Sequence, residues 1–409
     1  MNETRRPGIS TLMNHTGKEN PLRAAVPPIY QTSAFAFDDA ASSAAAFQDP
    51  ASAYIYTRWR NPNQDQLAEQ ITALEALDLL RASPGRPMDE IAAGLVFSSG
   101  MAAITSAILA AVKPGQTIIA QQALYTASYT FMQNWADRYG FRTVFLQDTS
   151  PEKWEEAFAA HPEAVLAFAE TPANPTLSLT DLASAAEIAH KHGARLMVDN
   201  TFASPYCQRP LSLGADIVLH STTKFLAGHG VVTGGAVVST DCSYVRGPLF
   251  DQFKMLGGTP GPFDCWLTSL GLKTFELRMQ RHCSNALETA RFLAQHPAVA
   301  KVYYPGLEDS AQYALACRQM SSFGGMVSFE LKGGLEAGVN MVNRVRLCTL
   351  MASLGNAETI ITHPASMTHS SLTPTIRREM GIAEGLVRLS VGIENIEDIL
   401  DDLDQALRG

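Results

Sequence analysis

The chain has 409 residues, of which 46% are hydrophobic and 17% charged, so it can bury a sizeable core and is not a wholly disordered chain. Its 31 basic and 40 acidic residues leave a net charge of −9, which argues against a protein built to bind nucleic acid. No apolar run of about 18 residues occurs, so we expect neither a membrane-spanning helix nor a membrane partner.

The first 65 or so residues differ in pattern from the rest. The segments PPIYQTSAF (27–35) and YIYTRWRNPN (54–63) contain prolines and aromatic residues that follow neither a helical nor a strand period. Such a pattern is typical of an extended arm that lies on another surface. We therefore expect residues 1–65 to form an N-terminal arm that contacts a neighbouring subunit of a homo-oligomer.

From residue 66 the hydrophobic pattern alternates regularly between helices and strands. It predicts helices at 67–80, 101–112, 125–140, 151–160 and 181–193. It predicts short apolar strands at 95–99, 116–120, 142–147, 164–170, 195–200, 215–220 and 234–239. This alternation, with nearly continuous apolar strands, indicates a mostly parallel sheet covered by helices on both faces.

A second region begins near Pro260. The stretch 263–296 is predicted to be one long helix that could kink at Gly271. The later pattern predicts strands at 324–331 and 385–392 and a helix at 396–408. We therefore expect a larger domain over 66–260 and a smaller C-terminal α/β domain over 261–409.

The cysteines show neither a C-x-x-C pair nor the clustering with histidine that a zinc site needs, so we expect no metal. The opening residues lack the apolar core of a secretory signal. We therefore expect a cytoplasmic protein with reduced, mostly buried thiols. The cysteines are Cys207, Cys242, Cys265, Cys283, Cys317 and Cys348.

In open parallel sheets, ligands bind at the carboxyl ends of the strands. At one such end, Ser99-Gly100-Met101 begins a helix and could present N–H groups to an anion. Taken alone, this segment is better explained as an ordinary Ser/Gly helix cap. Residues 228–233 resemble a dinucleotide-binding loop, but Thr233 replaces its third glycine and a strand follows, so we reject that alternative.

Two further strand ends carry polar residues with a more specific chemistry. Asp199 ends one strand, and Lys224 follows the next strand beside Ser221 and Thr223. Separately, the aspartate could be a turn residue and the lysine a solvated one. Together with the helix start at Ser99, they supply phosphate anchors, an acid for a ring nitrogen and a Schiff-base lysine. Pyridoxal 5′-phosphate (PLP) needs this set.

These residues lie in segments by which the chain resembles the PLP-dependent trans-sulfuration family of methionine and cysteine metabolism. Its members include methionine γ-lyase, cystathionine γ-synthase, cystathionine γ-lyase and the O-acylhomoserine sulfhydrylases. The matching segments, in the family's order, are PPIYQTSAF, YTRWRNP, SSGMAAI, PANP, VDNTFASPY, ADIVLHSTTKFLAGH, PGPFDCW, SLGNAET, HPASMTH and GLVRLSVGIE. The resemblance implies the α/β fold of PLP-dependent transferases (aspartate aminotransferase-like, fold type I), with PLP bound in the domain at 66–260.

The resemblance also implies roles for individual residues toward the cofactor. Lys224 would hold PLP through an imine bond, and Asp199 would pair with the pyridine nitrogen. The phosphate would be held by the helix start at Ser99, by Ser221 and Thr223, and by two arm residues of the neighbouring subunit. The residues implied in cofactor binding are Lys224, Asp199, Ser99, Gly100, Met101, Tyr125, Asn174, Ser221, Thr223, Tyr56 and Arg58.

For the substrate, the resemblance implies that Arg388 forms a bidentate pair with the α-carboxylate, helped by Ser353. Asn174 would touch both the ring hydroxyl and the substrate. Tyr125 would stack on the pyridine ring and act in proton transfer, so that Lys224, Tyr125 and Asp199 are the catalytic residues. The alternatives are a surface salt bridge for Arg388 and an ordinary packed aromatic for Tyr125.

Three features bear on the reaction. Methionine γ-lyases tend to carry Y-G-C-T where this chain has 125–128 as YTAS, which argues against efficient methionine cleavage. Cystathionine-handling members tend to carry Glu just before S-L-G, where this chain has Ala352, which argues against an enzyme that handles cystathionine. Residues 353–392 are most similar to methionine γ-lyase.

A separate feature is the segment RASPGRPMDE (81–90), which looks like an insertion relative to the family and is expected at the surface.

We therefore expect a PLP-dependent enzyme that acts at Cγ of amino acids. The first hypothesis is γ-elimination from a γ-substituted homoserine-type amino acid, such as methionine, homocysteine or canavanine, through a vinylglycine-type intermediate. The alternative is γ-replacement, as in an O-acetyl- or O-succinylhomoserine sulfhydrylase or a cystathionine γ-synthase. A catalytically silent scaffold that retains PLP is a third hypothesis. The family resemblance implies an active dimer, with a tetramer formed as a dimer of dimers.

Overall fold

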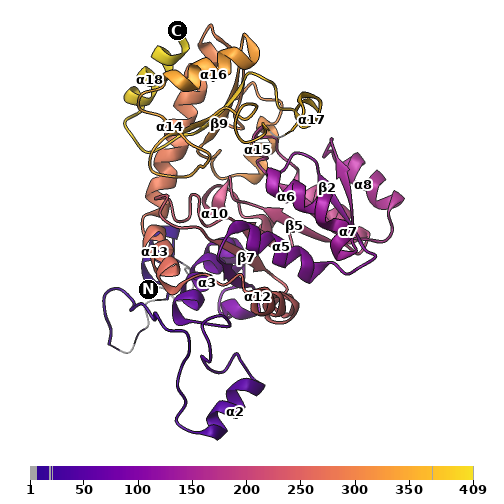
Figure 1. The fold of residues 1–409 in the computed structure, drawn as a ribbon, viewed down its shortest axis with the longest axis vertical. Coiled ribbons are helices and arrows are strands. Elements are labelled where there is room, and N and C mark those ends of the chain that lie inside the picture. Colours follow the sequence, from indigo (N-terminus) through magenta and orange to yellow (C-terminus); the bar gives the residue numbers. More distant parts are fainter. Residues whose placement is uncertain (1–6, 18–19, 21, 371, 409) are drawn as a thin grey trace.

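The computed structural model describes residues 7–17, 20, 22–370 and 372–408, and it contains two β-sheets (Figure 1). The larger sheet has seven strands in the order β1-β7-β6-β5-β4-β2-β3. These strands are β1 (Ala93–Phe97), β2 (Thr117–Gln121), β3 (Arg142–Leu146), β4 (Ala164–Glu170), β5 (Arg195–Asp199), β6 (Ile217–His220) and β7 (Gly235–Ser239). The strands from β6 to β3 are parallel, whereas β7 runs antiparallel to both its neighbours. The predicted mostly parallel sheet is thus confirmed.

Helices cover both faces of this sheet, as predicted. Successive strand residues point to opposite faces, so Val198 belongs to one buried cluster and Met197 to another. The first cluster also contains apolar residues of α3 (Pro62–Glu75) and α9 (Leu182–Lys191). The second contains residues of α5 (Gly100–Ala111). The strands are therefore nearly continuous apolar runs, because neither face of the sheet is exposed to solvent.

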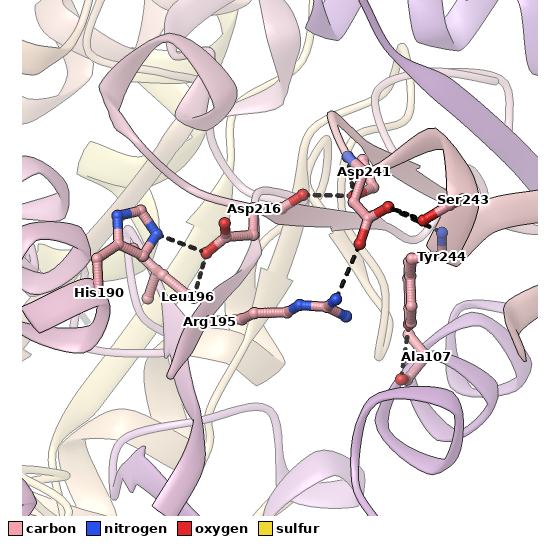
Figure 2. A network of polar contacts seen from close by, with 9 residues as sticks. Ala107, His190, Arg195, Leu196, Asp216, Asp241, Ser243 and Tyr244 are labelled. Carbon is pink, nitrogen blue, oxygen red and sulfur yellow. Dashed lines mark hydrogen bonds and ion pairs between the residues drawn. The ribbon is translucent and has the colours of Figure 1, made fainter. Parts of the chain in front are cut away.

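A polar network fixes the amino-terminal edge of the sheet (Figure 2). The carboxylate of Asp216, just before β6, accepts a hydrogen bond from the Leu196 N–H of β5 at 2.7 Å and contacts His190 at 2.9 Å. Arg195, at the start of β5, pairs with Asp241 beyond β7 at 2.8 Å. These contacts hold β5, β6 and β7 together at the amino ends of the parallel strands. Ligands bind at the opposite end of the sheet, where the carboxyl ends of these strands lie.

Two predicted helices of the larger domain are divided in the structure. The helix predicted at 67–80 is split at Ala76 into α3 and α4 (Leu77–Ala82). It also begins earlier, because the Asn61 side chain caps the helix by accepting from the Asn63 N–H and Pro62 follows at the first position. The helix predicted at 125–140 contains a π-helical turn at its centre. Its parts are α6 (Thr126–Thr130), η2 (Phe131–Trp135) and α7 (Ala136–Tyr139).

The N-terminal arm is not wholly extended, so that part of the prediction is wrong. Its first helix, α1 (Ile9–His15), packs on the body, and the Ser10 N–H donates to Glu276 at 2.7 Å. Its second helix, α2 (Ala40–Gln48), stands away from the rest of the chain (Figure 1). The small residues there are helical because Asp39 and Ser42 form a capping box. That the arm contacts a neighbouring subunit remains a prediction, and its opening residues lie outside the described ones.

The smaller sheet has five strands in the order β10-β11-β12-β9-β8. They are β8 (Val299–Tyr303), β9 (Met326–Leu331), β10 (Thr349–Leu350), β11 (Ile360–Thr362) and β12 (Leu386–Ser390). The helices of this half are α13 (Pro262–Leu272), α14 (Phe275–Gln295), α15 (Tyr313–Gln319), α16 (Gly334–Arg344), α17 (Pro374–Glu379) and α18 (Ile396–Arg408). All five strands follow residue 260, although the domain boundaries themselves remain predictions. No helix among those described is long and apolar enough to cross a bilayer.

The stretch predicted as one long helix over 263–296, with a possible kink at Gly271, forms two helices that separate just after that position. The chain turns between α13 and α14 at Lys273 and Thr274. The guanidinium of Arg278 reaches back from α14 and donates to the Gly271 carbonyl at 2.9 Å and to the Phe225 carbonyl at 2.8 Å. The Gly271 carbonyl near the end of α13 therefore has a side-chain partner, and Arg278 also joins α14 to the loop after β6.

All six cysteines are free thiols, which agrees with the prediction. The Sγ atoms of Cys207 and Cys283 lie 3.7 Å apart in the interior. The buried thiols are Cys207, Cys265, Cys283 and Cys348.

Candidate functional site

A cavity of about 910 Å³ lies at the carboxyl ends of the larger sheet's strands, facing the smaller sheet. It brings together all the predicted site residues except Tyr56 and Arg58. The predicted residues that line it are Ser99, Gly100, Met101, Tyr125, Asn174, Asp199, Ser221, Thr223, Lys224, Ser353 and Arg388. These positions are far apart in sequence, and parallel strand register brings their elements to the same edge.

One wall of the cavity is suited to a phosphate group. Ser99 caps α5 by accepting a hydrogen bond from the Ala102 N–H at 3.0 Å, so the first-turn N–H groups of α5 point toward the cavity end of the helix. A Cβ atom on Gly100 would stand 2.9 Å from the Cβ of Ser221, so only glycine permits this close approach of the helix start to the hydroxyl. The arrangement forms a cradle of N–H and hydroxyl donors that fits the phosphate of PLP.

Lys224 projects into the cavity from the loop after β6. Its Nζ donates a hydrogen bond to the Ser353 hydroxyl at 3.3 Å. Burial, and secondly the positive charge of Arg388, lower the pKa of the Lys224 amine to about 8. A substantial fraction of this amine is therefore uncharged near neutral pH, which is the form that attacks a carbonyl carbon.

This shift predicts how the cofactor-free protein responds to pH. In the unfolded chain the lysine keeps its proton to an ordinary pKa near 10.5, whereas in the folded chain it releases the proton near 8. Between these values the unfolded state binds more protons, so Lys224 makes folding stability rise with pH. We expect Lys224→Met to be stabilised relative to the wild type most strongly below pH 8, with the advantage shrinking as pH rises toward 10.5.

Urea unfolding of both cofactor-free proteins at several pH values between about 7 and 9.5 measures this difference. The comparison cancels the titration of every other group that the two proteins share. An advantage that stays constant over this range, or that grows with pH, would show that the folded protein does not depress the pKa of Lys224.

Asp199 ends β5 at the floor of the cavity. One carboxylate oxygen accepts a hydrogen bond from the Thr201 N–H at 3.0 Å. Burial raises the pKa of the Asp199 carboxyl, because the charged form has lost most of its hydration. A cationic partner in the cavity would restore ionisation. The protonated ring nitrogen of PLP is such a partner, so the carboxylate also fits this cofactor.

Glu170, which sequence reasoning missed, supports two of the predicted residues. It ends β4, and its two carboxylate oxygens accept from the Tyr125 N–H and the Asn174 N–H, each at 2.8 Å. Burial, and secondly the negative charge of Asp199, raise the pKa of Glu170 to about 8. The signal was available in the sequence, because Glu170 ends a predicted strand at the same sheet edge as Asp199.

Arg388 reaches the cavity from the smaller sheet. The residue is only 5% exposed, and its guanidinium donates to the Asn174 side chain at 2.8 Å and to the Ser353 carbonyl at 3.0 Å. Burial lowers its pKa to about 10, so the group stays cationic at neutral pH. No carboxylate of the described residues lies within ion-pair distance of Arg388. This is incompatible with a surface salt bridge and leaves its charge available for a substrate carboxylate.

The remaining predicted residues differ in placement. The Tyr125 ring lines the cavity and is 46% exposed, which is incompatible with an ordinary packed aromatic. Tyr56 and Arg58 lie in the arm and do not line the cavity of their own chain. The Arg58 guanidinium lies 5.8 Å from the centre of the Tyr56 ring and donates to the Lys254 carbonyl. Their action on a neighbouring subunit remains a prediction.

The chain is similar to known proteins over nearly its whole length. The sequence model of the family described as "Cys/Met metabolism PLP-dependent enzyme" matches residues 10–408. The chain is 46% identical over 404 residues to the L-methionine gamma-lyase of Porphyromonas gingivalis, with 98% of this chain and 97% of that protein covered. It is 40% identical over 408 residues to the cystathionine gamma-synthase of Mycobacterium bovis, with 98% and 97% covered.

Solved structures show the same likeness in three dimensions. The crystal structure of cystathionine gamma synthase from Xanthomonas oryzae pv. oryzae, in complex with aminoacrylate and cysteine, superposes with a TM-score of 0.89. That protein is 39% identical, and the match covers 99% of this chain and 98% of the other. The predicted fold class is thereby confirmed.

Proposed function

The chain belongs to the PLP-dependent enzymes of cysteine and methionine metabolism, and from this we propose that it catalyses γ-elimination from a γ-substituted homoserine-type amino acid. Methionine, homocysteine and canavanine are the candidate substrates. The relatives named L-methionine gamma-lyase support elimination. One observation carries the proposal: Lys224 and Arg388 face the same cavity as the phosphate cradle. The Lys224 amine has a lowered pKa, and the Arg388 guanidinium has no carboxylate of the described residues within ion-pair distance.

We infer that these residues divide the binding of cofactor and substrate between the two sheets. The start of α5, Ser221 and Thr223 would hold the phosphate of PLP, and Asp199 would hold its ring nitrogen. Arg388 of the smaller sheet would bind the α-carboxylate, oriented by its hydrogen bond to Asn174. When bound, PLP supplies the electron sink that makes protons on the substrate's carbon chain removable.

The proton-handling groups are then Lys224 and Tyr125. The Lys224 amine would take the proton from Cα, for which its pKa of about 8 places it close to neutral pH. The Tyr125 hydroxyl would give a proton to the group that leaves Cγ. Glu170 holds the backbone of Tyr125 and so sets the direction of this donor. The expected products are 2-oxobutyrate, ammonia and the released group.

γ-Replacement is the second candidate, supported by the relatives named cystathionine gamma-synthase. Ala127 and Ala352 stand where the family patterns carry Cys and Glu, and both line the cavity, so its wall has small side chains at these points. A cavity of this kind has room for the leaving group of γ-elimination and for that of γ-replacement. The two reactions differ in their products and not in the residues that bind PLP.

Product analysis distinguishes γ-elimination from γ-replacement. Methionine, homocysteine, canavanine, O-acetylhomoserine and O-succinylhomoserine are each incubated with the enzyme, with and without sulfide. We expect 2-oxobutyrate and ammonia from the first three without any added nucleophile. Formation of a new γ-substituted amino acid only from an O-acylhomoserine with sulfide or cysteine would contradict elimination as the main reaction, and no turnover at all would favour a silent scaffold.

We further propose an active homodimer, assembled as a tetramer in the cytoplasm, in which the arm completes the neighbouring site. Arg58→Ala should then weaken PLP retention although Arg58 lies outside its own cavity. Mixing two inactive proteins, Arg58→Ala and Lys224→Ala, under subunit exchange should restore some activity. The reason is that a mixed dimer contains one site with both wild-type residues.

Mass spectrometry of differently labelled subunits verifies that exchange has occurred. Activity of the exchanged mixture is then compared with that of each parent alone. If mixed dimers form and no activity returns, Arg58 does not act across the subunit boundary.

A further inference from the structure

A buried arginine of α14 contacts the loop that carries Lys224, although it does not line the cavity. Arg278 is 5% exposed, and its guanidinium donates to the Phe225 carbonyl at 2.8 Å and to the Leu226 carbonyl at 3.2 Å. These are the two residues that follow Lys224 in the chain. A third bond, to the Gly271 carbonyl at 2.9 Å, joins the same guanidinium to α13. Arg278 therefore links the segment after the lysine to the helices of the smaller half.

Capping of α13 alone does not explain these contacts. The Gly271 carbonyl also accepts a hydrogen bond from the Thr274 N–H at 3.3 Å, so the end of α13 has a partner of its own. Among the described residues, Arg278 is the one hydrogen-bond donor to the buried Phe225 and Leu226 carbonyls. No carboxylate in that part of the chain lies within ion-pair distance of Arg278. Burying an unpaired cation is costly, so its contacts with the lysine loop call for a reason beyond helix stability.

The smaller half contacts the backbone of Lys224 at a second place. Gly355 has a φ of +78°, and a Cβ atom there would stand 2.5 Å from the Phe225 nitrogen and 2.9 Å from the Lys224 carbonyl carbon. Ser353, two residues earlier, accepts the hydrogen bond from the Lys224 amine at 3.3 Å. The lysine and the residue after it thus pack directly on the loop at 353–355, while Arg278 holds the carbonyls that follow. Together these contacts define the position from which the lysine side chain enters the cavity.

We propose that Arg278 is a positioning residue for Lys224, because it fixes the backbone from which the amine reaches PLP. The inference rests on the assignment of Lys224 to PLP in the proposed function, and not on which group leaves Cγ. The lysine nitrogen must form a bond to the aldehyde carbon of PLP while the aldehyde oxygen leaves as water. This step depends on the direction of attack, and a displacement of about 1 Å can slow such a step about a hundredfold.

The phosphate cradle is held by contacts that do not include Arg278. The Ser221 N–H donates to the Thr201 hydroxyl at 2.9 Å. The Gly234 N–H donates to the Thr223 hydroxyl at 2.9 Å, which anchors that residue beside β7. Loss of Arg278 should therefore slow the covalent capture of PLP while leaving its noncovalent binding intact.

Two measurements on the cofactor-free protein separate these steps. The first is the Kd of pyridoxine 5′-phosphate, which carries an alcohol in place of the aldehyde and cannot form the imine bond. The second is the rate constant at which the absorption band of covalently held PLP appears at saturating PLP, followed by stopped flow. Both are measured at pH 9, above the pKa of about 8 of Lys224, so that most of the lysine amine is uncharged.

Arg278→Met should lower the rate constant of capture about ten- to a hundredfold and leave the Kd of pyridoxine 5′-phosphate unchanged. Arg278→Lys should lower it less, because an ammonium group can reach one carbonyl but lacks the planar fork that binds both. Arg281→Met is the matched control. Arg281 is exposed on the same helix, and its loss should change neither quantity.

A capture rate equal to that of the wild type in Arg278→Met would overturn the positioning role. A loss of capture rate that is matched by a loss of affinity for pyridoxine 5′-phosphate would also overturn it, because the damage would then extend to the whole cavity. If Lys224→Ala retained the absorption band, the assignment of Lys224 to PLP would fail, and the role of Arg278 with it. Unexpected reaction products would affect neither conclusion.

Thr274→Val tests the same proposal if the Arg278 variants do not fold. The Thr274 hydroxyl accepts a hydrogen bond from Nε of Arg278 at 3.2 Å, and the residue is exposed. Its replacement leaves the guanidinium present but less firmly oriented. Slower capture with an unchanged Kd of pyridoxine 5′-phosphate is the expected result, and an unchanged capture rate would overturn the proposal.

Discussion

Replacing Lys224 with alanine should abolish turnover while leaving the fold nearly intact. Lys224 is the lysine of the described chain that lines the cavity, and burial has already depressed the pKa of its amine to about 8. Water cannot replace an amine that must both bind the cofactor covalently and move a proton. We expect the absorption band of the covalently held cofactor to disappear, and kcat to fall by several decades.

Absorption spectra, kcat and far-ultraviolet circular dichroism, measured on the same preparations, check this result. Lys301→Ala is the matched control, because Lys301 is an exposed lysine of β8 outside this cavity, and it should leave all three unchanged. Turnover of Lys224→Ala within about tenfold of the wild type would show that another group performs the chemistry.

Replacing Arg388 with leucine should raise KM steeply and lower kcat/KM roughly ten- to a hundredfold. Hydrogen bonds to charged groups contribute about 1.5–3 kcal/mol, and about 1.4 kcal/mol corresponds to one decade. PLP binding should survive, because Arg388 is assigned to the substrate. The loss of the neighbouring positive charge should also raise the pKa of Lys224, since that charge now lowers it.

The control is the amine that corresponds to the substrate without its α-carboxylate. Wild type and Arg388→Leu should handle this amine almost equally, because it offers the guanidinium nothing to bind. If the variant loses PLP, or acts normally on the carboxylated substrate, Arg388 has a structural role instead.

The strands and the cavity were predictable from sequence because both follow from local pattern. The runs 164–169 and 196–198 are continuously apolar, which indicates strands buried on two faces, and the polar residues that follow each run therefore lie at the same end of the sheet. This is why Asp199 could be placed beside Lys224 without knowledge of the packing. The same criterion would have found Glu170 had it been applied to β4.

Other features depend on partners that are distant in sequence. The turn between α13 and α14 is fixed by Arg278, which contacts a carbonyl 53 residues away in the chain. The Oε1 atom of Glu75 lies 2.6 Å from Nε2 of His220, although 145 residues separate the two in the chain. Glu75 reads locally as a surface residue near the end of an amphipathic helix, and nothing in its neighbours shows that it meets a histidine. Only the packing of α3 against the sheet reveals the pair.

The antiparallel direction of β7 also determines where the protein can accept added sequence. Because β7 returns beside β6, residues 221–234 connect the two strands directly at the cavity edge, and both ends of this loop are held by the sheet. Added residues there would displace the lysine. The segment 81–90 instead joins α4 to β1 at the surface, and most of its residues are exposed. An affinity tag or a reporter domain inserted at 81–90 would therefore leave the reacting groups in place.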